Sequence, residues 1–514
     1  MNKLRLTTTC GLTATTLTAL AGCGMSGGDA SVGGSGSPDG RSIVIDEPYA
    51  PAANWALETD DAFILTKAGC LETLVKYENG GTLRPMLATS WTQVKPTVWK
   101  LRIRQGVKFQ DGTPVDAKAV AGALQHALKV KTPAAAFSPE TVSGVEAVDS
   151  STVEVTTVEP NVVLPQSLAS PNTGILAPKA YSGSATDPKG TCTGPFQITR
   201  EIPQQAIELE RNDDYWGGRA RLTSAEVRFI ADGAKRATQV RTGEAQIARK
   251  IPVTSVQEFK GDKSVQTRTA ELPRTTELIL NNKKAPFTSA KVRQALQAAI
   301  DTKAIASAVY PGASRQAVGP FAPGDPWAPK GAAPVKTDPA RAKSLLAEAG
   351  VDPSSLKLTL LAYNEGSGFA DLATVIQEQL KAIGIKVSIR SGEYASMEPD
   401  LLDGDFYMAL LSRNYLNTLP DPYGFLSSDY TCKGSYNLAH YCDATVDALV
   451  KKAASARNTT DRYALYADVA TRLQSQAVDV FLVHETESVA LAGVKGYQIH
   501  PYYTLTADLS RGSK

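Results

Sequence analysis

The spacing of apolar residues along the chain alternates between helical and strand-like periods. Between residues 62 and 77 apolar side chains recur every three or four positions, which predicts a helix. Four later segments share this spacing and predict further helices: 116–128, 289–300, 338–350 and 372–384. Three segments are typical of strands, by alternation or by apolar composition: 99–104, 385–389 and 405–411. Helices and strands that alternate in this way predict an α/β fold.

The first 40 residues differ in composition from the rest of the chain. Lys3 and Arg5 precede an uncharged run that ends in Leu20-Ala21-Gly22-Cys23, which is the pattern of an export signal. The four residues at its end resemble the lipobox of bacterial lipoproteins. This resemblance implies a signal peptide of residues 1–22, acylation of Cys23, and an anchor on the outer face of the cell membrane. Residues 23–40 are rich in Gly and Ser and predict a flexible tether.

Charge and length limit what the body of the protein can be. The leader holds two of the 54 basic residues and none of the 52 acidic ones, so 52 positive and 52 negative charges remain. A balanced charge argues against a nucleic-acid partner, which would require a basic surface. After the leader no apolar run approaches the roughly 18 residues of a membrane span. Residues 41–514 are too many for one core, and two or three domains are expected.

Four cysteines follow Cys23, and an even number outside the cytoplasm favours disulfides. Cys432 and Cys442 flank a short polar loop, which makes them the expected pair. A metal site formed by these two cysteines and His440 is the alternative, although structural zinc sites usually have four ligands at closer spacings. Cys70 and Cys192 then form the second pair by elimination. No metal or other cofactor is predicted.

Several short segments resemble those of one family in order and spacing, from about residue 63 to residue 500. The resemblance rests on 74–77 (LVKY), 87–91 (LATSW), 101–112 (LRIRQGVKFQDG), 193–196 (TGPF), 211–218 (RNDDYWGG), 241–248 (RTGEAQIA) and 286–295 (PFTSAKVRQA). These segments are similar to those of the extracytoplasmic solute-binding proteins of bacterial ABC importers, family 5, which bind peptides or nickel.

The resemblance implies a type II fold of the periplasmic-binding-protein class, with two main α/β lobes, an inserted lobe and a hinge. It places lobe I in residues 41–80, 186–280 and 485–514, the inserted lobe in 81–185, and lobe II in 281–484. The chain would cross between the main lobes near 280–282 and 481–485. Ligand is expected between the lobes, where it favours the closed form.

Motifs of the common hydrolases and nucleotide-binding enzymes are absent from the sequence. There is no Gly-x-Ser-x-Gly, no His-Glu-x-x-His and no phosphate-binding loop, and the chain has four histidines. A binding protein that is not an enzyme is therefore the expectation.

The segment that follows the predicted strand 405–411 is the expected ligand contact. Peptide-binding members of the family commonly place an aspartate there, against the ammonium group of the peptide. In this chain the matching positions are Arg413, Asn414, Tyr415 and Asn417, and the first acidic residue is Asp421. Arg413 could pair with a carboxylate of the ligand, with a structural ion pair as the alternative. Tyr415 could form an aromatic wall of the site or pack between the lobes.

Together these observations predict a monomeric lipoprotein that captures short peptides or peptide-like solutes and delivers them to an ABC permease and its ATPase. A nickel or other metal chelate is the alternative cargo. Family members that hold chelates tend to use arginines of the inserted lobe, and residues 132–137 and 164–178 contain none. A surface lipoprotein that senses a signalling peptide is the alternative from another functional class.

Overall fold

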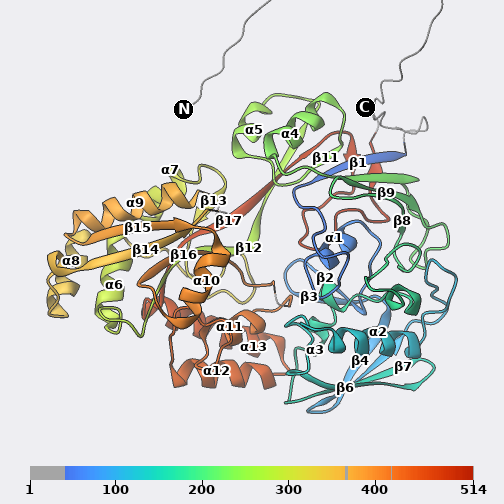
Figure 1. The fold of residues 1–514 in the computed structure, drawn as a ribbon, viewed down its shortest axis with the longest axis horizontal. Coiled ribbons are helices and arrows are strands. Elements are labelled where there is room, and N and C mark those ends of the chain that lie inside the picture. The colour runs from blue at the N-terminus through green and yellow to red at the C-terminus, as the bar shows by residue number, and fades with distance from the viewer. Residues whose placement is uncertain (1–40, 365–367, 418, 513–514) are drawn as a thin grey trace, which may run out of the picture.

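One long mixed sheet runs through most of the computed structural model, which describes residues 41–364, 368–417 and 419–512 (Figure 1). Cys23 and the predicted tether lie outside these residues. The strands of this sheet are, in spatial order, β15 (Lys386–Gly392), β14 (Lys357–Tyr363), β16 (Met408–Asn414), β12 (Gln266–Leu280), β17 (Asp479–Leu491), β11 (Ile247–Ala248), β1 (Ser42–Glu47), β10 (Ser224–Phe229), β9 (Ala206–Arg211) and β8 (Phe196–Ile202), and β13 (Ser314–Gln316) also pairs with β17.

The two halves of this sheet belong to two bodies, which we name lobe I and lobe II. Lobe I holds the half from β11 to β8, and lobe II holds the half from β15 to β16 (Figure 1). The helices of lobe I are α1 (Asp61–Lys67), α4 (Gly233–Thr242) and α5 (Val253–Glu258), and its C-terminal segment adds the small pair β18 (Val494–Lys495) and β19 (Ser510–Arg511). The helices of lobe II are α6 (Ala290–Ala299), α7 (Thr302–Ala308), α8 (Pro339–Glu348), α9 (Phe369–Ala382), α10 (Tyr394–Asp403), α11 (Tyr423–Tyr430), α12 (Ala444–Ser455) and α13 (Thr459–Ser475).

A third body, the inserted lobe, is built on an antiparallel sheet of its own. Its order is β4 (Ala88–Lys95), β5 (Val98–Ile103), β7 (Thr152–Thr157) and β6 (Val142–Asp149), and α2 (Ala117–Lys129) and α3 (Leu164–Ser167) pack beside it. The hairpin of β2 (Val75–Glu78) and β3 (Thr82–Pro85) precedes this sheet in the chain. Two main α/β lobes joined by crossing strands, with a third lobe inserted in the chain, agree with the architecture that the sequence predicts.

Most of the expected elements are present, and one is wrong. The predicted helix over 62–77 ends at Lys67, and the same segment continues as a bend and then as strand β2. Gly69 has a φ of +69°, and the carbonyl groups of Gly69 and Cys70 accept hydrogen bonds from Phe196 and Gly194. Contacts with a distant segment therefore replace the next turn of the helix.

The strands β12 and β17 join the two lobes, and their pairing changes register where they cross. Glu271 pairs with Thr486, and the next pair is Thr275 with His484. Beyond this shift, residues 275–280 pair with β16 of lobe II. The crossing in β17 lies near the predicted 481–485, whereas that in β12 precedes the predicted 280–282. We therefore propose that lobe II begins at this register shift rather than at residue 281.

Among the helices of the part of the chain that the structure describes, none is long and apolar enough to cross a membrane.

Candidate functional site

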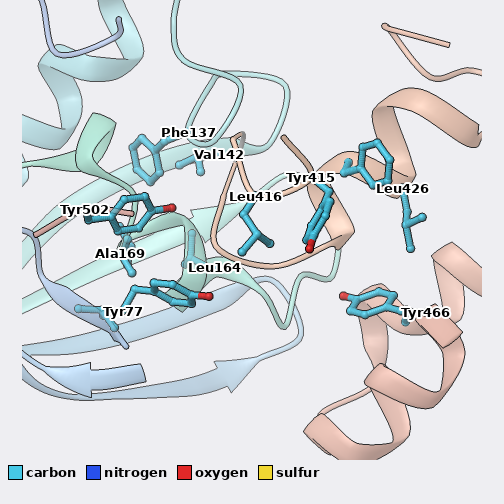
Figure 2. Close-up of a cluster of buried hydrophobic side chains, with 14 of the residues drawn as sticks. Tyr77, Phe137, Val142, Leu164, Ala169, Tyr415, Leu416, Leu426, Tyr466 and Tyr502 are labelled. Carbon is cyan, nitrogen blue, oxygen red and sulfur yellow. The ribbon is translucent and has the colours of Figure 1, made fainter. Parts of the chain in front are cut away.

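A cluster of buried apolar and aromatic side chains lies where the lobes meet. Figure 2 shows Tyr77 and Tyr502 on one side of this region and Tyr415 and Tyr466 on the other. Leu416, in the loop after β16, lies between them. We name this region the interlobe site, because its side chains come from both main lobes.

Arg413 forms a structural ion pair in lobe II. Its Nε and Nη2 donate to Oδ2 and Oδ1 of Asp429 at 2.5 and 2.8 Å, and its guanidinium lies 4.5 Å from the centre of the Tyr436 ring. The side chains of Arg413 and Asp429 are 20% and 8% exposed. This bidentate pair uses the Nε and Nη2 edge of the guanidinium, with which Arg413 would bind a ligand carboxylate. Of the two roles considered for Arg413, the structure favours the structural one.

Asp421 is also part of lobe II, where its carboxylate has hydrogen bonds and an ion pair with residues of the same lobe. Its Oδ1 accepts from the Tyr466 hydroxyl at 2.6 Å and from the Tyr423 amide at 2.9 Å, and Arg462 lies 3.4 Å from its other oxygen. The side chain is 1% exposed, and burial raises the pKa of its carboxyl group. This carboxylate fixes the loop to α13 and does not point to solvent.

The remaining predicted contacts lie at the end of β16 and just beyond it. Asn414 is the last residue of this strand, and its Oδ1 accepts from the Leu416 amide at 3.0 Å, which shapes the turn. Tyr415 is buried, and its hydroxyl donates to Asp325 at 2.5 Å. Asn417 is exposed. Of the five predicted residues, Asn417 is thus the one whose side chain the structure leaves open to solvent.

Asp325 is an acidic residue of the interlobe site that the sequence reasoning missed. It lies in a segment rich in Pro and Gly, between Phe321 and Trp327. Burial raises the pKa of its carboxyl group to about 6, against the opposing effect of the hydrogen bond from Tyr415. The charge of Asp325 in turn helps to raise the pKa of Tyr77 in lobe I, although burial of Tyr77 is the larger cause.

The hairpin of β2 and β3 touches lobe II directly at Gly81. A Cβ atom on this residue would lie 2.6 Å from the Tyr463 hydroxyl oxygen and 3.0 Å from the Trp327 ring. The rings of Trp327 and Tyr463 lie edge to face, with centroids 5.5 Å apart. A side chain at this position would have to displace Tyr463 or Trp327, so Gly81 allows the hairpin to lie close against lobe II.

Replacing Gly81 with alanine is expected to hinder closure of the lobes and so to weaken ligand binding. Gly80→Ala is the matched control: Gly80 has a φ of +83° against +85° for Gly81, and nothing lies within 4 Å of its Cβ position. The two variants share the backbone strain, so their difference measures the interlobe contact. We expect calorimetry to give weaker affinity for Gly81→Ala than for Gly80→Ala. Equal affinities would contradict this role.

Buried charges tie three strands of lobe I together next to the crossing. Arg249 follows β11, and it donates to Glu487 of β17 at 2.8 and 2.9 Å and to Glu47 at the end of β1 at 3.2 and 3.3 Å. All three side chains are at most 9% exposed. We name this set the Arg249 network.

A neutral histidine links both crossing strands to the segment that carries Asp325. Nε2 of His484 accepts from the Val318 amide at 3.2 Å, so the ring proton is on Nδ1, 3.0 Å from the Thr275 hydroxyl. That hydroxyl donates to the Pro320 carbonyl at 2.9 Å. Burial lowers the pKa of His484 to about 4, which keeps the ring neutral at pH 7.

The segments that carry the family resemblance hold lobe I together. The buried carboxylate of Glu72 accepts from Thr193 at 2.7 Å, Tyr215 at 2.7 Å and Trp216 at 2.8 Å. Thr193 belongs to the TGPF segment and the two aromatic residues to RNDDYWGG. Burial raises the pKa of Glu72 to about 7 despite these donors. These motifs therefore indicate the fold, not the ligand.

Both pairs of cysteines form the disulfides expected from the sequence. Cys70 is joined to Cys192, and Cys432 to Cys442. The metal site considered for Cys432, His440 and Cys442 is therefore wrong, because both sulfur atoms are in a disulfide and His440 Nε2 lies 3.0 Å from the Leu401 carbonyl. Within residues 41–364, 368–417 and 419–512, no three His, Cys, Asp or Glu side chains are arranged to hold a metal ion.

Comparison with known proteins assigns the fold to a family. The sequence model of the bacterial extracellular solute-binding proteins, family 5 (middle), matches residues 82–437. The chain belongs to this family. Its members are binding proteins of ABC importers that work outside the cytoplasm, and the relatives found are binding proteins and not enzymes.

Relatives that bind different ligands have similar sequence identities to this chain. The nickel-binding protein NikA of Staphylococcus aureus is 26% identical over 472 residues, which cover 91% of this chain and 93% of that protein. The di/tripeptide-binding protein 2 of Pseudomonas aeruginosa is 27% identical over 452 residues, or 82% of this chain and 85% of that one. HbpA2 of Haemophilus parasuis shares the fold at a TM-score of 0.83 and 24% identity, over 92% of this chain and all of that one.

Proposed function

We propose that this protein captures a short peptide or a peptide-like solute between its two main lobes and delivers it to an ABC permease and its ATPase. The observation that carries the proposal is the interlobe site. There the hydroxyl of Tyr415 donates to Asp325. Tyr77 of lobe I lies close enough for the charge of Asp325 to help raise its pKa. A solute held there contacts both lobes at once and so favours the closed form.

The polar groups of this site suit a peptide. Asp325 provides a carboxylate that can accept a hydrogen bond from the ammonium group of a peptide. The loop after β16 has no acidic side chain free to do this. Asn417 is open to solvent and can bind a peptide amide. Arg413, which was considered as a carboxylate clamp, is engaged by Asp429 and is left out of this proposal. Among the relatives, a di/tripeptide-binding protein supports this class of solute.

A chelate of nickel is the second candidate, because NikA of Staphylococcus aureus matches this chain over 93% of its own length. In that case the metal would be cargo, held by its chelator as much as by the protein. The inserted-lobe segments 132–137 and 164–178 contain no arginine for the carboxylates of such a chelator.

A thermal-shift screen of residues 41–514 distinguishes the two candidates. The protein is refolded to remove carried-over ligand, and is then tested against di- to pentapeptides and against nickel with histidine. A ligand present at 100 times its dissociation constant adds about 2.7 kcal/mol to the free energy of unfolding. We expect stabilisation by peptides alone. Stabilisation only by nickel together with histidine would identify the chelate, and not a peptide, as the cargo. If neither stabilised the protein, both candidate cargoes would be rejected.

We also propose that a lipid on Cys23 holds the protein at the outer face of the membrane. The support is the lipobox-like sequence and the Gly- and Ser-rich segment after it. Cys23→Ser is expected to move the protein from the membrane fraction to the soluble fraction, as fractionation and immunoblotting would show. If the variant stayed with the membranes, the anchor on Cys23 would be rejected.

A further inference from the structure

The inserted lobe contacts lobe II as well as lobe I. In the segment 158–163, between β7 and α3, the amide of Val162 donates to the carbonyl of Ala454 on α12 at 3.1 Å. Figure 1 shows α3 beside α13, and there the oxygen of the Gln166 side-chain amide accepts from Nη2 of Arg462 at 3.1 Å. Two hydrogen bonds therefore cross the boundary between the inserted lobe and lobe II. We name this pair of hydrogen bonds the latch.

The segment before α3 is fixed on the inserted lobe. The Asn161 carbonyl accepts from the Trp99 indole of β5 at 2.9 Å, and the Asn161 amide donates to the Pro96 carbonyl at 3.3 Å. The Asn161 side chain accepts from the Val163 amide at 2.8 Å. The Val163 carbonyl in turn accepts from the side-chain nitrogen of Gln166 at 3.1 Å. Gln166, which is 6% exposed, therefore presents its oxygen to lobe II in a fixed orientation.

Arg462 connects the latch to the interlobe site. Its side chain is 4% exposed, its Nη2 lies 3.4 Å from Oδ2 of Asp421, and its Nη1 donates to the Ala456 carbonyl at 3.4 Å. The other oxygen of Asp421 accepts from the hydroxyl of Tyr466, which belongs to the interlobe site. A hydrogen bond to a buried charged group is stronger than one between neutral groups. The contact between Gln166 and this guanidinium is therefore the stronger half of the latch.

The inserted lobe is attached to lobe I and moves with it. Both of its chain connections lead to lobe I, near residues 80 and 186. Backbone hydrogen bonds of 2.9 Å also join these two lobes, and they include those from Ala88 to Leu74, from Ile175 to Glu72 and from Gln110 to Cys192. Domains that close around a ligand move as bodies about the segments that connect them, which here are β12 and β17. When the main lobes separate, the inserted lobe leaves with lobe I, and the latch must break.

We propose that the latch holds the lobes closed over the solute, with Gln166 as its positioning residue on the inserted lobe. The inference rests on the proposed function and gives the inserted lobe a part in retaining the solute. A contact that exists only in the closed form stabilises that form and slows release. Because Arg462 also contacts Asp421, the latch and the interlobe site form in the same movement.

The test compares the rates at which solute dissociates from the wild type and from Gln166→Met. Methionine has a side chain of similar length that accepts hydrogen bonds only weakly. Gln125→Met is the matched control, because Gln125 on α2 donates to the Val145 carbonyl at 2.7 Å within the inserted lobe. The probes are di- to pentapeptides and nickel with histidine, and surface plasmon resonance gives the rates. Thermal unfolding of each variant shows that it is folded.

We expect dissociation from Gln166→Met to be about tenfold faster than from the wild type, with little change in the association rate, because the latch forms after the solute has entered. Gln125→Met should release solute at the rate of the wild type. A double-mutant cycle makes the test specific to the pair. In a protein that carries Arg462→Met and Asp421→Asn, adding Gln166→Met should give no further acceleration, since the latch is already broken.

Equal dissociation rates for Gln166→Met and the wild type would overturn the latch while the proposed function stood, and so would an equal acceleration in Gln125→Met. If no probe bound to the wild type, the proposed function would be rejected, and X-ray scattering without solute would decide on the latch separately. A larger radius of gyration for Gln166→Met than for the wild type would then support the latch, and equal radii would overturn it.

Discussion

Replacing Arg249 with methionine is expected to destabilise the protein by about 3–5 kcal/mol, because it leaves two buried carboxylates without their counter-charge. Glu47 and Glu487 are 9% and 1% exposed, and the arginine side chain between them is 4% exposed. The charge of Arg249 holds the pKa of Glu487 below its usual range, against the effect of burial. Urea unfolding followed by circular dichroism gives the free energy directly.

A matched surface pair and a rescue variant make this prediction specific. Arg84 pairs with Glu78 at 3.2 Å, but these side chains are 62% and 42% exposed, so Arg84→Met should cost less than about 1 kcal/mol. Combining Arg249→Met with Glu47→Gln and Glu487→Gln should recover part of the lost stability, because neither of the two buried carboxyl groups then carries a charge. If Arg249→Met cost no more than Arg84→Met, the network would not hold the three strands together.

Elements governed by local signals could be predicted from the sequence. Helix α2 is one example, because its apolar face is regular and Asp116 caps it by accepting from the Ala119 amide at 2.8 Å. The helix expected over 62–77 fails for the opposite reason. Its apolar spacing continues past Lys67, but hydrogen bonds from residues more than 120 positions later hold the chain in a bend at Gly69 and Cys70. A periodic pattern contains no information about such distant partners.

The candidate site could be located from the sequence more readily than its residues could be assigned. The region after β16 does lie at the interlobe site, but the partner of Arg413 is Asp429 on α11, and only the fold brings the two together. Asp325 was missed because it lies in a loop without periodicity, between Gly324 and Pro326. An acidic residue flanked by turn formers is a weak signal by itself, and its role follows from its contact with Tyr415.

Acidification is expected to destabilise the protein through His484, by about 3 kcal/mol between pH 6.5 and pH 4. The folded state binds the His484 proton only near pH 4, whereas an unfolded histidine binds it near pH 6.5. The unfolded state therefore gains the proton first as the pH falls, and each unit of this pKa difference is worth about 1.4 kcal/mol. Above pH 7 both states are neutral at this position, and the contribution is constant.

The measurement compares the free energy of urea unfolding of the wild type and of His484→Gln from pH 4 to pH 8. Glutamine keeps an acceptor for the Val318 amide but does not titrate, so the variant should lose less stability on acidification than the wild type does. Other groups contribute with the opposite sign: Asp325 and Glu72 have raised pKa values of about 6 and 7, and their contribution is lost as the pH rises. These groups are present in both proteins and cancel in the difference. Parallel curves for the two proteins would show that His484 does not remain neutral in the folded state. The hydrogen bonds that join the crossing strands to the Asp325 segment would then not depend on an uncharged ring.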